Sequence, residues 1–237
     1  MFLLVSICAM SIFGHQIWLI WQSDNASTEN YALLADQVRH IKPVPDATSN
    51  NPDVAIDFTA LRATNPDAVA WLYCPDTVID YPVMRASDYN YYLHHLPDGT
   101  RNPNGSLFID YNCPSDFSGY LTVIYGHHIK SGRMFGSLKG YKSQTYYEKH
   151  PSMYLYTEDS NYRIDLLYGC VIGANEWRNQ AYMYEVNLDA FMDYAARNTT
   201  FTSRVQYNPG DQMVALSTCS YEFGDARYVV IGVLRGD

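Results

Sequence analysis

A cysteine and an arginine stand near the end of the sequence, each at the edge of a run with strand character. Cys219 ends the run ALSTC (residues 215–219), and Arg227 begins the run RYVV (227–230). Two antiparallel strands joined by residues 220–226 would bring both side chains to the same end of a sheet. A thiol is nucleophilic as thiolate, which a nearby cation favours. Arg227 keeps its proton and can meet an oxyanion but cannot act as a base, so this chemistry needs a separate proton-transfer group.

Histidine can supply that group, because its unperturbed pKa lies near neutrality. His127 and His128 follow a strand-like run that ends at Tyr125 and Gly126, and a turn comes after them. Successive strand residues face opposite ways, so we expect at most one of the two histidines to face Cys219. Taken singly, each residue has a more common structural role: a strand-end cysteine is usually a small buried hydrophobe, and such histidines and arginines usually lie on the surface.

The composition indicates a single domain and argues against nucleic-acid binding. The chain has 237 residues, 47% of them hydrophobic, which is enough for a sizeable core. Its 16 Lys and Arg against 25 Asp and Glu give a formal net charge of −9, which argues against a phosphate-binding surface. The 22 tyrosines suit half-buried strands and wet surfaces and favour a β-rich, extracytoplasmic protein.

The five cysteines show no metal-binding pattern. They form no C-x-x-C pair and have no zinc-type spacing with the seven histidines, so we expect no metal and no cofactor. An odd number of cysteines in an exported chain leaves at least one thiol unpaired unless it pairs between chains. A disulfide between Cys74 and Cys113 stays open at this point.

Residues 1–22 are expected to form a transmembrane anchor. Residues 2–21 contain no Lys, Arg, Asp or Glu, and such a helix spans about 30 Å, the thickness of a bilayer's hydrocarbon core. Trp18 and Trp21 stand where an aromatic belt would lie. No Lys or Arg precedes the segment to orient it, but an acidic body without a second span suits an extracellular domain on a single-pass protein of the cell membrane.

The rest of the chain divides into a polar stalk and one mostly β domain. Residues 23–53 form the stalk, with a short helical stretch around Tyr31–His40. In the domain, residues 54–237, short β-type runs recur between turn residues, which is typical of a barrel or sandwich. These runs are 70–73, 78–84, 106–110, 121–125, 153–157, 162–172, 212–217 and 227–234. One helix is expected over residues 188–197, capped by Asn187 or Asp189.

Several linked motifs, in this order, resemble those of the sortases, and class B sortases in particular. The segment IYGH (124–127) followed by G-x-M-F (132–135) looks like the class B histidine segment. The segments LSTC (216–219), YEF (221–223) and ARYVV (226–230) look like its cysteine–arginine segment. Upstream, WL (71–72), IDYPV (79–83), YL (92–93) and GSLFID (105–110) resemble the family's earlier strands. The likeness runs from about residue 57 to 234; one departure is Ala215, where the family usually has Thr.

The resemblance implies a sortase-type closed β-barrel of about eight strands, with an N-terminal helix and a helix inserted in a late loop. It assigns Cys219 as the nucleophile, His127 as general acid and then base, and Arg227 as the stabiliser of an oxyanion or of the substrate backbone. The candidate substrate contacts are Leu93, Ser217, Ser220, Glu222, Tyr182 and Met183. Tyr182 and Met183 lie in residues 172–186, which match the long loop of class B. Packing in the hydrophobic core accounts for the aromatic side chains of that loop equally well. Nothing resembles the acidic calcium site of class A sortases.

The implied reaction cuts a C-terminal sorting signal of secreted proteins through a thioacyl intermediate and transfers them to an amine of a peptidoglycan precursor. One alternative is a pilin-polymerising sortase; class C enzymes of that role usually carry a second hydrophobic span, which we do not find before Asp237. Another is a non-enzymatic, membrane-anchored surface module that binds wall polymer through its tyrosines. A papain-like protease is disfavoured, because there the cysteine opens a helix and precedes the histidine.

Overall fold

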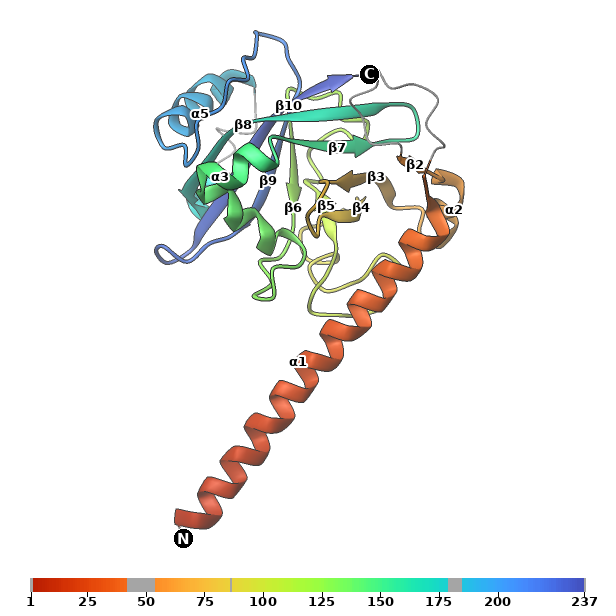
Figure 1. The fold of residues 1–237 in the computed structure, drawn as a ribbon, viewed down its shortest axis with the longest axis vertical. Coiled ribbons are helices and arrows are strands. Elements are labelled where there is room, and N and C mark those ends of the chain that lie inside the picture. The colour runs from red at the N-terminus through yellow and green to blue at the C-terminus, as the bar shows by residue number, and fades with distance from the viewer. Residues whose placement is uncertain (1, 42–53, 86, 179–184, 237) are drawn as a thin grey trace.

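This computed structural model describes residues 2–41, 54–85, 87–178 and 185–236. Eight strands close into a barrel in the order β10-β8-β7-β3-β4-β5-β6-β9 (Figure 1). They are β3 (Ala68–Tyr73), β4 (Asp80–Met84), β5 (Leu107–Ile109), β6 (Leu121–Tyr125), β7 (Ser152–Tyr156), β8 (Asn161–Gly173), β9 (Met213–Cys219) and β10 (Ala226–Gly236). Each predicted strand run overlaps one of them, and the predicted mostly β, closed-barrel fold is confirmed.

Strand β9 is buried on both faces, and its alternating side chains enter two different cores. Val214 and Leu216 point into the barrel, where they meet apolar side chains from all the other strands. Met213 and Ala215 point outward into a second cluster. Burying a large apolar side chain stabilises a fold by about 1.5–3 kcal/mol, so both faces fix the register of β9 and with it the position of Cys219.

The outward cluster is covered by the late helices. Between β8 and β9 in the sequence lie α4 (Ala174–Arg178) and α5 (Glu185–Arg197). Trp177 of α4 and Phe191 of α5 are buried against the outer face of the barrel, with their ring centroids 5.3 Å apart. The helix predicted over residues 188–197 is therefore present, and it begins upstream of both residues expected to cap it.

Two further helices lie between β6 and β7, a segment for which no helix is predicted. They are the 3-10 helix η1 (Phe135–Lys142) and α3 (Gln144–Lys149). The side chains of Phe135, Leu138 and Tyr141 are buried in the core inside the barrel. This segment therefore packs directly on the core beneath the loop that carries His127.

The N-terminal region differs most from the sequence prediction. Helix α1 (Phe2–Val38) runs without a break through the boundary expected at residue 22. After it, β1 (Arg39–Ile41) pairs with β2 (Val54–Ile56). Helix α2 (Phe58–Thr64) is capped by Asp57, whose side chain accepts a hydrogen bond from the Ala60 amide at 2.9 Å.

The two halves of α1 have different surroundings. Its last turns pack beside the barrel through Leu34 and Val38, while its first turns project away from the body of the molecule (Figure 1). On the projecting part, large apolar side chains are exposed, among them Phe13 and Trp21. Among the described residues, no helix combines the length and the apolar character needed to cross a bilayer. The membrane anchor predicted for residues 1–22 is not supported by this finding.

Candidate active site

Cys219 and Arg227 are paired residues on neighbouring antiparallel strands. In the register of β9 and β10, Cys219 lies directly opposite Arg227, at the end of the barrel where β9 stops and β10 starts. This is the arrangement predicted from the two strand-edge runs. The Arg227 guanidinium donates to the backbone carbonyl of Ala226 at 3.0 Å. No acidic side chain in the described part of the chain pairs with it, which leaves its charge available to an anion.

The parallel pairing of β6 with β9 brings His127 to the same end of the barrel. Tyr125 stands opposite Ser217, the Gly126 amide donates to the Ser217 carbonyl at 3.2 Å, and the buried Thr218 hydroxyl donates to the Gly126 carbonyl at 2.8 Å. A Cβ on Gly126 would lie 2.4 Å from a Leu107 methyl carbon. Only glycine therefore lets the chain leave β6 so close to the core and place His127 at the rim.

The ring of His127 is held in one tautomer. Its Nε2 lies 2.8 Å from the carbonyl oxygen of Leu93, and a carbonyl only accepts, so Nε2 carries the proton in the neutral ring. Nδ1 is then the nitrogen that can take up and deliver a proton. Burial lowers the pKa of His127; the Leu93 carbonyl opposes this, and the neighbouring His94 lowers the pKa further. A neutral imidazole at neutral pH can serve as a base.

His128 has a different environment. Its ring stands edge-on to that of Tyr221, with the centroids 5.1 Å apart, and it is hydrogen-bonded to the backbone of Cys219. Burial lowers its pKa, and the bond to the Cys219 backbone opposes that shift. His128 therefore supports the loop after the cysteine.

A cavity of about 790 Å³ opens at this end of the barrel. Cys219, Arg227 and His127 all line it, together with the predicted contacts Leu93 and Ser217. Such a volume can hold several residues of an extended peptide. The other lining residues are Tyr89, Asn90, Phe108, Tyr111, Asn112, Cys113, Pro114, Gly119, Tyr120, Leu121, Tyr125, Gly126, Trp177 and Thr218.

Ser217 is a buried lining residue with an unused hydroxyl. Only 1% of the residue is exposed, and its Oγ finds no hydrogen-bond partner among the described residues. An unsatisfied buried polar group costs about 1–3 kcal/mol. A peptide group in the cavity could relieve that cost, which agrees with the predicted role of Ser217 as a substrate contact.

The remaining predicted contacts lie elsewhere. Ser220 and Glu222 belong to the loop between β9 and β10, where the Lys142 ammonium donates to the Ser220 hydroxyl at 3.0 Å and pairs with the Glu222 carboxylate. The structure thus places them beside Lys142 and outside the cavity lining. Tyr182 and Met183 lie outside the described residues.

The sequence reading missed a polar cluster in the cavity wall. The Asp110 carboxylate is fully buried and accepts from the hydroxyls of Tyr89 at 2.9 Å and Tyr125 at 3.0 Å, and from the Asn112 amide at 2.9 Å. Burial and the Asp110 charge raise the pKa of Tyr125, so its hydroxyl stays a donor. Asp110 ends the segment GSLFID (105–110), which carries part of the family resemblance, and no spacing rule links it to Tyr89 or Tyr125.

The other thiols differ from Cys219. Cys74, Cys113 and Cys170 are buried and free, which closes the question of a disulfide between Cys74 and Cys113. Burial raises the pKa of Cys113 to about 11 and that of Cys170 to about 12, so both stay protonated. Cys219 is only half-buried and lines the cavity, as a reactive thiol requires. The described residues hold no cluster of His, Cys, Asp and Glu suited to a metal ion.

Comparisons with known proteins agree with the fold and with the resemblance seen in the sequence motifs. No protein-family model matches the sequence. The chain is 29% identical to Sortase B of Listeria monocytogenes, over 97% of this chain and 95% of that protein. Its fold is similar to that of a Staphylococcus aureus sortase B–substrate complex, with a TM-score of 0.75 and 23% identity over 91% of this chain and 99% of the other.

A third similar protein is a Streptococcus pyogenes class B sortase involved in pilus biogenesis, with a TM-score of 0.67 and 25% identity over 76% of this chain and 98% of the other. Together with the motifs, these findings confirm the resemblance to class B sortases. They support a cysteine transpeptidase of the sortase type as the class of enzyme.

Proposed function

We propose that this class B-type sortase cleaves a C-terminal sorting signal on secreted proteins and transfers them to an amine of a cell-wall precursor. The observation that carries the proposal is the meeting of Cys219, Arg227 and His127 in one cavity at the end of the barrel. We further propose that the catalytic domain acts on the extracellular side, where such substrates and the wall precursor are present.

The first half of the reaction follows from the chemistry of these three groups. The Cys219 thiolate attacks the carbonyl carbon of the scissile peptide bond, and the Arg227 guanidinium meets the negative charge that develops on the carbonyl oxygen. His127, protonated by the proton that it takes from the Cys219 thiol, gives that proton to the departing amine as the C–N bond breaks. A thioester remains on Cys219. Stabilising charge that exists only in the transition state accelerates the step.

The second half reverses these roles. The amine of the wall precursor attacks the thioester carbon, and neutral His127 accepts the proton that the amine releases. The C–S bond breaks and returns the thiolate of Cys219. A thioester conserves the free energy of the cut peptide bond, so the new amide needs no nucleotide cofactor, and water in place of the amine gives slow hydrolysis.

A peptide library tests the proposal. The full chain is incubated with peptides carrying varied sorting-type motifs, and the products are read by mass spectrometry. We expect cleavage at one motif and a covalent acyl adduct on Cys219, with neither in Cys219→Ala. Binding of wall polymer that persists in Cys219→Ala, with no cleavage of any peptide by the unmodified chain, would instead point to the non-enzymatic surface module.

A second candidate role is supported by the similarity to the pilus-biogenesis sortase. In pilus assembly the acceptor would be a lysine amine on a neighbouring pilin. The cleaved peptide is therefore offered oligoglycine-type and pilin-type amines side by side. Transfer to the oligoglycine amine supports wall anchoring, and transfer to the pilin amine alone replaces it with the second role.

A further inference from the structure

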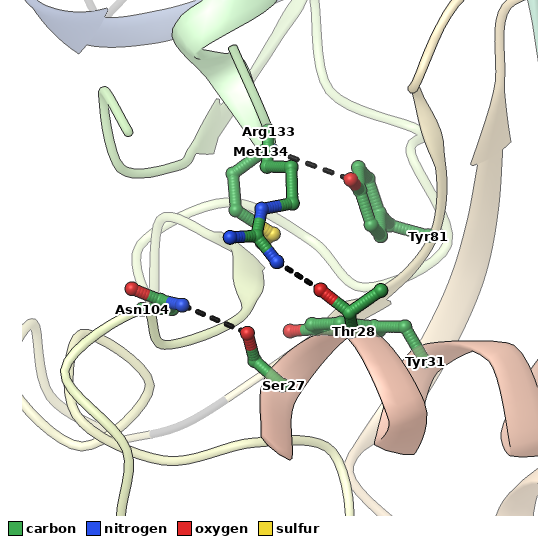
Figure 2. A pocket seen from close by; sticks show the side chains of 7 residues that line it. All are labelled: Ser27, Thr28, Tyr31, Tyr81, Asn104, Arg133 and Met134. Atoms are coloured by element: carbon green, nitrogen blue, oxygen red, sulfur yellow. Dashed lines mark hydrogen bonds between the residues drawn. The ribbon is translucent and has the colours of Figure 1, made fainter. Parts of the chain in front are cut away.

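The second half of α1 is joined to two loops of the barrel by polar contacts (Figure 2). The Asp24 carboxylate pairs with the Arg133 guanidinium at 2.5 Å, and Arg133 also donates to the Asp24 carbonyl at 2.7 Å and to the Thr28 hydroxyl. From the other loop, the Asn104 amide donates to the Ser27 hydroxyl at 2.7 Å and to the Asp24 carboxylate at 2.9 Å. Asp24 thus contacts both loops at once.

The first of these loops continues directly from His127. Phe135 donates its amide to the His127 carbonyl at 3.1 Å, and Met134 forms a β-bridge with His128. Met134 has a φ of +51°, which is unfavourable for a side chain of this type and persists only where the surroundings impose it. Arg133, the residue before it, is the one that α1 holds. The helix therefore restrains the backbone on which the His127 side chain is mounted.

The second loop supports the carbonyl that binds the His127 ring. The Tyr31 hydroxyl of α1 donates to the Gly105 carbonyl at 2.6 Å. Gly105 has a φ of +58° and packs so closely that an added Cβ would lie 2.7 Å from the Leu93 oxygen. That oxygen is the one that lies 2.8 Å from Nε2 of His127. The helix thus also restrains the group that fixes the tautomer of the ring.

We propose that α1 is a clamp for His127, and that Asp24 and Arg133 are positioning residues of the transpeptidase reaction. The clamp consists of Asp24, Ser27 and Tyr31 on α1 with Arg133, Asn104 and Gly105 on the two loops. It holds the backbone that carries the ring and the Leu93 carbonyl that orients it. The inference rests on the proposed function, since it takes His127 as the group that transfers protons.

Kinetics of the full chain test the clamp with a matched control. Asp24→Asn and Arg133→Met each break the ion pair. We expect kcat for cleavage of the library-selected peptide to fall about tenfold, while KM stays within about twofold of its value in the unmodified chain. The reason is that misplacing a reacting group slows the chemical step more than it weakens substrate binding. The control is Glu158→Gln in the exposed pair of Arg62 and Glu158, 2.6 Å apart. It should leave kcat unchanged; an equal fall there would overturn the proposal.

Charge reversal separates positioning from a general loss of structure. The double variant Asp24→Arg with Arg133→Asp restores an ion pair of opposite direction at the same place. We expect it to recover part of the kcat lost in Asp24→Asn, because the ion pair returns while the bond from the Asn104 amide to residue 24 does not. A double variant that is folded by circular dichroism and remains as slow as the single variants contradicts the clamp.

A second readout needs no substrate. In the full chain labelled with ¹³C-histidine, the ring signal of His127, identified by its loss in His127→Gln, should move in Asp24→Asn and return in the double variant. An unmoved signal overturns the clamp whatever the kinetics show. If the unmodified chain cleaves no peptide, the proposed function fails, while the ring signals still decide whether α1 restrains His127.

Discussion

The two adjacent histidines that follow β6 have different surroundings. His127 lines the cavity with Cys219, and its ring is oriented by the Leu93 carbonyl. His128 packs on Tyr221 and bonds the backbone of Cys219. Only a ring in the cavity can exchange protons with a peptide that occupies it, so the two residues should differ in their effect on the reaction.

We therefore expect His127→Ala to lower kcat/KM for peptide cleavage by about 10²–10⁴-fold, the usual contribution of general acid–base catalysis. His128→Ala should cost much less, because it removes only support for the loop after Cys219. Steady-state cleavage of the library-selected peptide by both variants measures the difference. If His128→Ala were the inactive variant and His127→Ala active, the assignment of the acid–base group would be wrong.

Ser217 offers a test of the cavity as the peptide site. Its buried hydroxyl has no partner among the described residues, so Ser217→Ala removes a group that the free protein does not use. We expect a free energy of unfolding within about 1 kcal/mol of the unmodified chain, or slightly higher, because no hydrogen bond is lost. We expect kcat/KM to fall about tenfold, the effect of one neutral hydrogen bond to the peptide. Urea unfolding and cleavage kinetics measure the two; a large fall in stability with unchanged kinetics contradicts this role.

At the scale of elements, the loop between β9 and β10 is attached to the end of η1. Lys142 bonds Ser220 and Glu222, and its ammonium lies 5.0 Å from the centroid of the Tyr228 ring. These contacts join the segment between Cys219 and Arg227 to a helix packed on the core. Burial alone would raise the pKa of Glu222, but the bonds from Lys142 and Ser220 outweigh it and lower that pKa to about 2.

The lowered pKa predicts how stability depends on pH. A carboxylate whose pKa is depressed by folding contributes stability above its unfolded pKa, and loses it as the pH falls through the folded pKa. The stabilisation from Glu222 should therefore be complete above about pH 4.5 and vanish towards about pH 2. Because both partners are partly exposed, we expect no more than about 1 kcal/mol. Urea unfolding of the unmodified chain and Glu222→Gln should differ at pH 6 and converge towards pH 2; a constant difference contradicts the pairing.

How far the sequence predicted these elements depended on whether their signals were local. The bounds predicted for β6 are those it has, because residues 121–125 form a β-type run that ends at Gly126. The sequence predicts two segments where α1 is one helix, because the polar residues after Trp21 resemble a stalk. In the folded chain those residues, including Asp24 and Ser27, bond to barrel loops about 80 or more positions away in sequence. A contact of that separation leaves no mark in the local pattern.

The same distinction holds for the site. Cys219 and Arg227 were brought together by a hairpin argument, which needs only neighbouring strands, and the observed register confirms it. His127 was expected near them from the motif resemblance, and its position follows from the parallel pairing of β6 with β9, which no local signal gives. The cluster around Asp110 depends on three segments whose proximity only the closed barrel creates.

At the scale of the whole molecule, the late helices and the barrel are joined by the second hydrophobic cluster, on the outer face of the barrel. The outer faces of β9 and β10 are buried only because α4 and α5 cover them, through Trp177, Phe191 and Met192 among others. Closure of the barrel leaves no unpaired edge in the ladder from β3 to β10. The helices and the strands that carry Cys219 and Arg227 should accordingly unfold together as one cooperative unit.

Truncating the buried ring of α5 tests this unity. Phe191 is fully buried, so Phe191→Ala should lower the free energy of unfolding by about 3–5 kcal/mol, the usual cost of removing a core aromatic. Phe223, which is 51% exposed, provides the matched control, and Phe223→Ala should stay within about 0.5 kcal/mol. Urea unfolding is followed by two probes: circular dichroism reports on the whole chain, and tryptophan fluorescence reports on the surroundings of Trp177 and Trp71. If the barrel and the helices form one unit, both probes should give the same midpoint in each variant. Two separate midpoints for Phe191→Ala would show that α4 and α5 unfold while the barrel stays intact. The stability of the strands that carry Cys219 and Arg227 would then not depend on these helices.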